Sequence, residues 1–347
     1  MTGLDRDLEH VLAHTAGVWE EFQGASLFIT GGTGFFGRWL LSSFAAANRR
    51  FGLSARALVL TRDAAGFKKR APELLRDPAV SLHSGDVRTF DFPSGKFSHI
   101  IHGATPASAA LNSERPLEMQ NIIIEGTRRV LDLARQSHGA KLLLCSSGAV
   151  YGRQPPEIER LSEDYGGGPD CLDPGSAYAE GKRLAELACA TYARQYEVQA
   201  KIARCYAFLG PHLPLDAHFA AGNFLRDALA GRPIRVNGDG TPYRSYLYPA
   251  DLMIWLWTIL ARGQTAWAYN VGSEEAIGIA DLARLIAKTV APGTRIEILR
   301  SAVPGRLPER YVPSTARARG ELGLAERIGL EEAIRRTEEW HRKWESG

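Results

Sequence analysis

The 347-residue sequence has few cysteines and no long apolar run, and each shortage excludes a class of protein. Its four cysteines, Cys145, Cys171, Cys189 and Cys205, form no Cys-x-x-Cys pair, which favours a reduced protein over a disulfide framework. The best candidate for a membrane span, Leu252–Leu260, falls well short of the roughly 20 apolar residues that a membrane helix needs. We therefore expect no membrane partner.

Charge of neither sign dominates the chain. Its 42 Lys and Arg residues against 39 Asp and Glu leave a formal net charge of +3, which argues against a nucleic-acid partner. Glycine and proline, 35 and 18 residues, are too few for a collagen-like or low-complexity chain. Residues 1–7 lack the basic and apolar regions of a secretory signal, so we expect a soluble, cytoplasmic protein.

Short apolar segments alternate with helical patterns along much of the chain. The segments that predict strands are residues 25–30, 57–60, 80–83, 99–102, 141–145 and 199–204. Strands that alternate with helices are typical of βαβ units, in which a parallel sheet is covered on both faces. We therefore predict the α/β class, with a Rossmann-type doubly wound parallel sheet.

A glycine-rich loop over residues 31–37 separates the first expected strand from the helix that begins near Arg38. Gly31, Gly34 and Gly37 are spaced three apart, which allows a tight turn and lets a pyrophosphate approach the backbone. The N-terminus of the following helix supplies N–H donors and partial positive charge. This context favours a dinucleotide site over a structural turn.

The end of the second strand bears on the choice of dinucleotide. Thr61 stands where an NAD-binding protein usually has an acid, and Arg62 follows it with a group suited to a 2′-phosphate. NADP is therefore slightly favoured over NAD, with Asp63 reaching the ribose as the alternative. Asp86, after the third strand, is expected either to accept from the adenine amino group or to serve only as a turn residue.

Tyr178 and Lys182 lie four residues apart at the start of an expected helix over 177–195, so both side chains share one face. A free tyrosine has a pKa of about 10. A neighbouring ammonium favours the phenolate and lowers this pKa toward the neutral range. Ser147, after the strand 141–145, offers a hydroxyl to hold a substrate oxygen. These residues favour a tyrosine that acts as a base near neutral pH.

With these motifs the chain resembles the extended short-chain dehydrogenase/reductases, in particular their NAD(P)-dependent nucleotide-sugar epimerase/dehydratase group, from about Ala25 to Leu324. The catalytic residues that this implies are Ser147, Tyr178 and Lys182. The expected cofactor contacts are Gly31, Thr33, Gly34, Phe35, Phe36, Gly37, Arg62, Asp86, Val87, Ala104, Thr105, Tyr178 and Lys182. The expected substrate contacts are Ser147, Tyr178, Asn223, Arg244 and Arg310. Arg244 and Arg310 would bind the diphosphate of the substrate through charge-assisted hydrogen bonds. We expect a nucleotide-sugar substrate, a homodimer and no metal.

We expect the chain to be divided into three parts. Residues 1–24 are expected to form an N-terminal helical extension, because apolar residues recur at helical spacing there. Residues 25–209 form the dinucleotide-binding Rossmann domain with the catalytic Ser, Tyr and Lys. Residues 210–347 form a smaller, mixed α/β C-terminal lobe that mainly binds the nucleotide sugar.

Two small residues mark a departure from the family pattern. Gly148 and Ala149 stand where 4,6-dehydratases carry an Asp and a Glu, and the decarboxylases also keep an acid at the position of Ala149. A dehydratase or decarboxylase is therefore less favoured, and an epimerase-type oxidoreductase of a nucleotide-activated sugar is the leading hypothesis. The alternative is an NADPH-dependent reductase of a 4-keto nucleotide sugar. The intact Ser, Tyr and Lys set argues against a non-catalytic cofactor-binding regulator.

Overall fold

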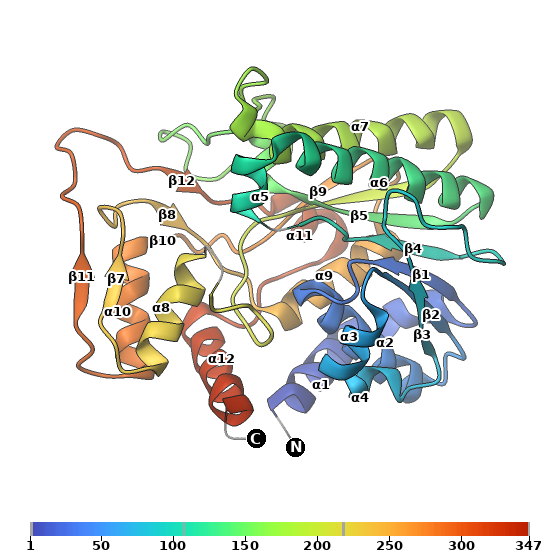
Figure 1. Ribbon diagram of the computed structural model, residues 1–347, viewed down its shortest axis with the longest axis horizontal. Coiled ribbons are helices and arrows are strands. Elements are labelled where there is room, and N and C mark those ends of the chain that lie inside the picture. Colours follow the sequence, from blue (N-terminus) through green and yellow to red (C-terminus); the bar gives the residue numbers. More distant parts are fainter. Residues whose placement is uncertain (1–2, 107, 217–218, 346–347) are drawn as a thin grey trace.

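The computed structural model describes residues 3–106, 108–216 and 219–345 (Figure 1). The strands of its main sheet are β1 (Ser26–Thr30), β2 (Arg56–Thr61), β3 (Val80–Ser84), β4 (His99–His102), β5 (Lys141–Ser147), β6 (Gln199–Cys205) and β9 (Ala268–Val271). They lie in the order β3-β2-β1-β4-β5-β6-β9, and all neighbouring pairs are parallel. The Rossmann-type doubly wound sheet expected from the sequence is confirmed.

Helices cover both faces of this sheet (Figure 1). The helices of one face include α6 (Pro116–Gln136) and α7 (Ala177–Tyr196), whose buried side chains pack with Phe28 of β1. Those of the other face include α1 (Gly3–Thr15), α2 (Phe35–Phe51), α9 (Pro249–Arg262) and α11 (Ala316–Leu322). The short helices between these elements are η1 (Ala16–Phe22), α3 (Ala64–Arg70), α4 (Pro72–Leu75), α5 (Ala109–Glu114), η2 (Gly148–Tyr151) and η3 (Pro174–Ser176).

The most apolar segment of the sequence, residues 252–260, lies within α9. Every residue from Pro249 to Ala261 is buried, because α9 packs against β5 and β6 on one side and against α1 and α2 on the other. A helix that is apolar all round is expected in such a position in the core of a protein. None of the described helices has the length and apolar character of a membrane span.

The smaller lobe is assembled from segments on both sides of β9. Its elements are α8 (Ala220–Leu229), β7 (Ile234–Val236), β8 (Tyr243–Arg244), β10 (Ile277–Gly278), α10 (Ile279–Val290), β11 (Ile296–Ile298), β12 (Arg310–Tyr311) and α12 (Leu330–Glu345). They form two small sheets, β10-β8-β12 and β11-β7, over a separate apolar core. Two elements that follow residue 210 belong to the main layer, because β9 pairs with β6 and α9 packs against β5 and β6.

A buried carboxylate joins the first helix to the last. Asp7 of α1 is 1% exposed and accepts from the Tyr248 hydroxyl at 2.6 Å and from Arg336 of α12 at 2.6 Å. Burial raises the pKa of Asp7, and the hydrogen bonds from these two partners oppose that rise. The N-terminal segment is thus part of the folded core, and α1 lies against α12 (Figure 1).

Candidate active site

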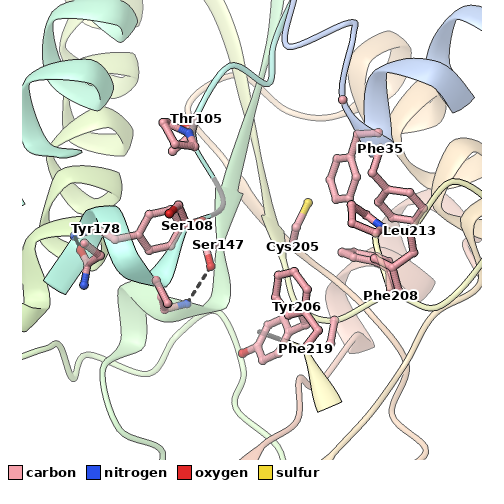
Figure 2. Close-up of a pocket in the computed structure, with 18 of the residues that line it drawn as sticks. Phe35, Thr105, Ser108, Ser147, Tyr178, Cys205, Tyr206, Phe208, Leu213 and Phe219 are labelled. Carbon is pink, nitrogen blue, oxygen red and sulfur yellow. Dashed lines mark hydrogen bonds between the residues drawn. The ribbon is translucent and has the colours of Figure 1, made fainter. Parts of the chain in front are cut away.

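A cleft of about 1870 Å³ opens where the strand order of the main sheet reverses, at the carboxyl ends of β1 and β4. Doubly wound sheets bind ligands at this switch point. The glycine loop, the ends of β5 and β6, and α8 and β8 of the smaller lobe contribute to its lining. Figure 2 shows Ser147 and Tyr178 on one side of the pocket, Phe35 and Phe208 on the opposite side, and Cys205 between them.

The glycine loop lines the cleft at the carboxyl end of β1. The residues of the expected cofactor set that line it here are Gly31, Thr33, Gly34, Phe35 and Phe36. Gly31 has a φ of +75°, and a Cβ on it would lie 2.5 Å from the backbone of Gly103, so only glycine fits. Gly37 lies beneath the cleft instead, where a Cβ would come within 2.2 Å of the Gly32 backbone. Gly37 therefore allows α2 to pack against the loop and is not a lining residue.

Next to the glycine loop, at the carboxyl ends of β2 and β3, the cleft is lined by Arg62, Asp86 and Val87. Arg88 donates to the Asp86 carboxylate at 2.8 and 3.0 Å, and these hydrogen bonds lower the pKa of Asp86 to about 2. Asp63 accepts from a backbone N–H of α3 at 2.8 Å and so caps that helix. Both carboxylates thus have protein partners, whereas Arg62 presents an exposed cation to the cleft.

The structure brings Ser147, Tyr178 and Lys182 together in the lining of the cleft. Lys182 is buried, and its ammonium donates to the Thr105 hydroxyl at 2.9 Å and to the Cys145 carbonyl at 2.8 Å. The ammonium lies 5.9 Å from the centre of the Tyr178 ring. The i to i+4 spacing on α7 thus places a fixed cation beside the phenol. Ala104 also lines this part of the cleft.

Burial sets the charge of these groups in the free protein. It raises the pKa of Tyr178, although a hydrogen bond with Ser147 opposes the rise. It lowers the pKa of Lys182 and raises that of the Cys145 thiol to about 11. The Tyr178 phenol is therefore protonated at neutral pH, and additional positive charge bound beside it would favour the phenolate.

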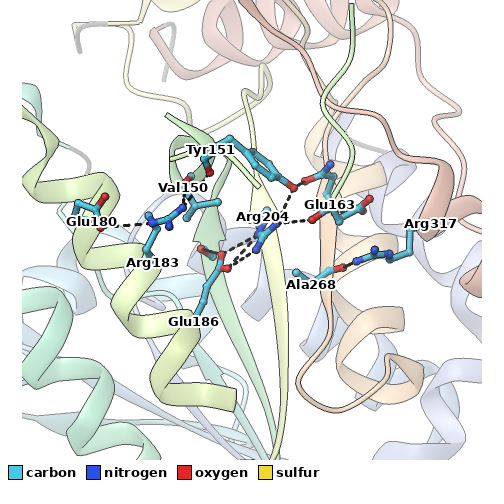
Figure 3. Close-up of polar contacts among 12 residues, drawn as sticks. Val150, Tyr151, Glu163, Glu180, Arg183, Glu186, Arg204, Ala268 and Arg317 are labelled. Carbon is cyan, nitrogen blue, oxygen red and sulfur yellow. Dashed lines mark hydrogen bonds and ion pairs between the residues drawn. The ribbon is translucent and has the colours of Figure 1, made fainter. Parts of the chain in front are cut away.

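An ion pair between β6 and α7 holds these elements against β5, the strand that ends at Ser147 (Figure 3). Arg204 of β6 and Glu186 of α7 approach to 2.7 Å, and the Ser146 hydroxyl donates to the same carboxylate at 2.5 Å. Arg204 also donates to the Tyr151 hydroxyl at 2.9 Å. The network ties α7, which carries Tyr178, to the strand that ends at Ser147.

The smaller lobe presents one of the two expected arginines to the cleft. In the parallel pair β8 and β12, Tyr243 lies opposite Arg310 and Arg244 lies opposite Tyr311. Because successive strand residues point to opposite faces, only one residue of each strand can face the cleft. Arg244 and Tyr311 line it, whereas the Arg310 guanidinium lies 4.5 Å from the centre of the Tyr243 ring, away from the described lining. The structure therefore does not bring Arg310 to the expected site.

Other arginines line the same lobe, but most have carboxylate partners. Arg226 and Arg232 both contact Asp227, at 3.2 and 2.9 Å. Arg235 contacts a carboxylate of β11 at 3.2 Å. Among the described residues, Arg244 has no carboxylate partner and donates only to a backbone carbonyl, at 2.8 Å. Arg244 is thus the lining arginine of this lobe best able to bind a ligand anion. Asn223 of α8 also lines the cleft.

Two tyrosines beside Ser147 line the cleft and were not expected from the sequence. The Tyr311 hydroxyl lies 3.5 Å from Ser147 Oγ, and the Tyr311 and Tyr206 rings are 4.5 Å apart between centres. A Cβ on Gly148 would lie 2.7 Å from the Tyr206 ring, so the small residue here makes room for this tyrosine. The alternation of β12 could have identified Tyr311, had its register against β8 been known.

Comparison with known proteins adds a family and a fold. A model of the NAD-dependent epimerase/dehydratase family matches residues 27–272. UDP-glucuronic acid decarboxylase 1 of Xenopus tropicalis is 33% identical over 244 residues, which span 70% of this chain and 56% of that protein. UDP-glucuronic acid decarboxylase 6 of Arabidopsis thaliana is 28% identical over 313 residues, 90% of this chain and 88% of that protein.

Solved structures of similar fold include two 4-epimerases. The UDP-glucose 4-epimerase of Thermotoga maritima superimposes with a TM-score of 0.77 at 20% identity, covering 92% of this chain and 99% of that one. The UDP-N-acetylglucosamine 4-epimerase of Methanobrevibacter ruminantium does so with a TM-score of 0.80 at 18% identity, covering 93% and 99%. At these identities the likeness shows the fold.

Proposed function

The chain belongs to the NAD-dependent epimerase/dehydratase family, and on that premise we propose that it is an epimerase-type oxidoreductase of a nucleotide-activated sugar. The observation that carries the proposal is the cluster of Ser147, Tyr178 and Lys182 in the cleft. The adjacent residues Gly148 and Ala149 bear no group that transfers a proton. The chemistry therefore has to proceed with little more than the Ser, Tyr and Lys set.

The cleft residues fit a nicotinamide dinucleotide. The loop at Gly31 and Gly34 leaves no side chain in the way of a pyrophosphate, and the 17-residue helix α2 begins directly after it. When bound, the nicotinamide supplies a hydride acceptor and a positive charge beside Tyr178.

Each catalytic side chain then has a defined task. Tyr178 takes the proton from a sugar hydroxyl while a hydride leaves the carbon that bears this hydroxyl. The Lys182 ammonium stabilises the phenolate form of Tyr178 that this proton transfer requires. Ser147 donates a hydrogen bond to the sugar oxygen. If the keto carbon were then reduced from its opposite face, Tyr178 would give the proton back to the oxygen, and the product would be the epimer.

A decarboxylase is the second candidate, because the curated relatives described above carry that activity in their names. Ala149 weighs against it. Incubation with UDP-glucose, UDP-N-acetylglucosamine and UDP-glucuronic acid, followed by chromatographic separation and mass spectrometry of the products, tests both functions. An epimer of unchanged mass supports the lead, and loss of carbon dioxide from UDP-glucuronic acid supports the decarboxylase. Stoichiometric consumption of NADPH by a 4-keto nucleotide sugar would instead indicate a reductase.

We predict that Arg62 contacts the 2′-phosphate of NADP. Arg62→Ala should then weaken NADP(H) binding by about 1.5–3 kcal/mol, the scale of a hydrogen bond to a charged group, and leave NAD(H) binding nearly unchanged. Calorimetric titration of both dinucleotides measures this. Lys68→Ala is a matched control, because Lys68 is an exposed cation of the adjacent α3 outside the described cleft lining. Equal affinities of the wild type for both dinucleotides would refute the preference for NADP.

We predict that Arg244 anchors the diphosphate of the substrate. The Arg244 guanidinium lines the cleft without a carboxylate partner and can make charge-assisted hydrogen bonds to the diphosphate. Arg244→Ala should therefore reduce the thermal stabilisation of the protein by UDP or dTDP. Arg310→Ala provides the comparison, and the geometry predicts almost no loss for it. An equal loss of thermal stabilisation in both variants would show that Arg244 and Arg310 both bind the diphosphate, as expected from the sequence. If no nucleoside diphosphate stabilises the wild type, the nucleotide-sugar proposal is wrong.

A homodimer and a cytoplasmic location stay predictions. Leu184 and Leu187 of α7 are 44% and 61% exposed and offer apolar surface on which a second copy could pack. Light scattering after size-exclusion chromatography would measure the oligomeric state.

A further inference from the structure

The hydrogen bonds of Ser147 determine what its hydroxyl can do for a substrate. A serine hydroxyl donates one hydrogen bond and accepts up to two. Ser147 Oγ accepts from the Ala149 backbone N–H at 3.1 Å and lies 3.5 Å from the Tyr311 hydroxyl. If Tyr311 is the donor in this second contact, both acceptor positions of Ser147 are filled. Its own proton is then left to point toward Tyr178 or a substrate oxygen.

Tyr311 is suited to be that donor. Burial raises the pKa of its phenol, although the hydrogen bond with Ser147 opposes the rise, so the hydroxyl is protonated at neutral pH. The residue stands on β12 of the smaller lobe, and the Arg244 guanidinium lies 5.9 Å from the centre of its ring. One side chain thus contacts both the catalytic serine and the arginine proposed to bind the diphosphate.

We propose that Tyr311 is a positioning residue that fixes the Ser147 hydroxyl as a hydrogen-bond donor and does so from the lobe that binds the nucleotide. The proposal rests on the function proposed above. The smaller lobe then takes part in the proton chemistry as well as in binding, because the orientation of the Ser147 hydroxyl depends on the position of β12.

The charged and titratable groups around Tyr178 allow this role to be detected by pH. Lys182 approaches Tyr178 from the same helix, Cys145 from β5, Cys205 from β6 and Tyr311 from β12. Arg244 of β8 lies against the Tyr311 ring. Burial raises the pKa of both thiols, to about 11 for Cys145, so they stay neutral near neutral pH. Lys182 donates to groups other than Tyr311, so loss of the Tyr311 hydroxyl leaves its contacts intact. A shift in the Tyr311 variant therefore reports on Tyr178.

The first test compares Tyr311→Phe with wild type in the UDP-sugar assay. A Ser147 hydroxyl free to turn stabilises the Tyr178 phenolate less, so kcat should fall by about tenfold, the upper range for one hydrogen bond, with KM changed less than about twofold. The rise of kcat with pH should move to higher pH. The matched control is Tyr243→Phe, which removes a phenol on the same pair of strands from the face turned away from the cleft. Tyr243→Phe should match the wild type.

A double-mutant cycle tests whether Tyr311 acts through Ser147. In the Ser147→Ala background the further loss of the Tyr311 hydroxyl should have almost no effect on kcat, because the group that it orients is gone. Independent, additive losses in the two variants would overturn the proposal, as would a Tyr311→Phe enzyme with the kcat and pH profile of the wild type.

A measurement without turnover separates this inference from the proposed function. The ultraviolet absorbance of tyrosinate, titrated from neutral to alkaline pH with NAD⁺ bound, gives the pKa of Tyr178 by comparison with Tyr178→Phe. Tyr311→Phe should raise that pKa, and an unchanged value would refute the role of Tyr311. If the wild type converts none of the UDP-sugars, the proposed function fails, and this titration still decides the role of Tyr311.

Discussion

The Tyr178→Phe variant is expected to fold, to bind NAD(H) and to lose about 10²–10⁴-fold of its turnover, the usual contribution of a general acid–base group. The substitution keeps the ring, which packs with the apolar core beneath α7, and removes only the hydroxyl that exchanges the proton. Turnover is measured as conversion of whichever UDP-sugar the wild type accepts, and dinucleotide affinity by calorimetry.

The control for this variant is Tyr192→Phe, on the same helix. The Tyr192 hydroxyl donates to Asp132 at 2.9 Å, and the residue lies outside the described cleft lining, so its loss should leave turnover within about twofold. Residual activity of Tyr178→Phe close to that of Tyr192→Phe would contradict the catalytic assignment. Lys182→Ala should also lose activity, and any remaining rate should reach its maximum at higher pH, because the phenolate loses its neighbouring cation.

Asp251→Ala is expected to lower the free energy of unfolding by about 3–5 kcal/mol, the scale seen when one partner of a buried charged network is removed. Asp251 is 0% exposed at the start of α9 and accepts from the backbone N–H groups of Arg327 and Ile328, both at 2.8 Å. It also contacts His10 Nε2 of α1 at 3.0 Å. The truncation leaves these buried donors without an acceptor, and each such donor costs about 1–3 kcal/mol.

Equilibrium urea unfolding followed by tryptophan fluorescence measures this loss. Asp281→Ala is the matched control, because Asp281 also stands in the first turn of a helix, α10, where its carboxylate forms an ion pair with Arg284. Its side chain is 65% exposed, and surface ion pairs contribute only about 0–1 kcal/mol, so little change is expected. Similar losses in both variants would show that position in the first turn, and not burial, sets the cost.

The main sheet was predictable because its signals are local. Each strand is a short apolar run, and the glycine loop follows β1 directly, as expected for a site at the switch point. The assignment of α9 and β9 was not predictable in the same way. Their return to the main sheet depends on packing against α1 and α2 and on pairing with β6, segments tens to hundreds of residues away in the sequence.

The catalytic residues were easier to foresee than the substrate contacts. Tyr178 and Lys182 are related by helical spacing alone, so their meeting follows from the sequence. Arg310 and Tyr311 are related by the pleat of a two-residue strand, and which of them faces the cleft depends on its register against β8. Arginine looked the better ligand for a diphosphate, yet the register turns Tyr311 toward the cleft.

The contact between Asp7 and Arg336 spans 329 residues of sequence, and this separation has a consequence for synthesis on the ribosome. At about 5–20 residues per second, translation of the intervening chain takes roughly 15–65 seconds. Throughout that time α1 lacks the guanidinium that its carboxylate binds in the finished protein. A nascent chain released before Arg336 would have to bury Asp7 without that cation or leave α1 undocked, so proteolytic protection of the N-terminus should arrive only with the last helix.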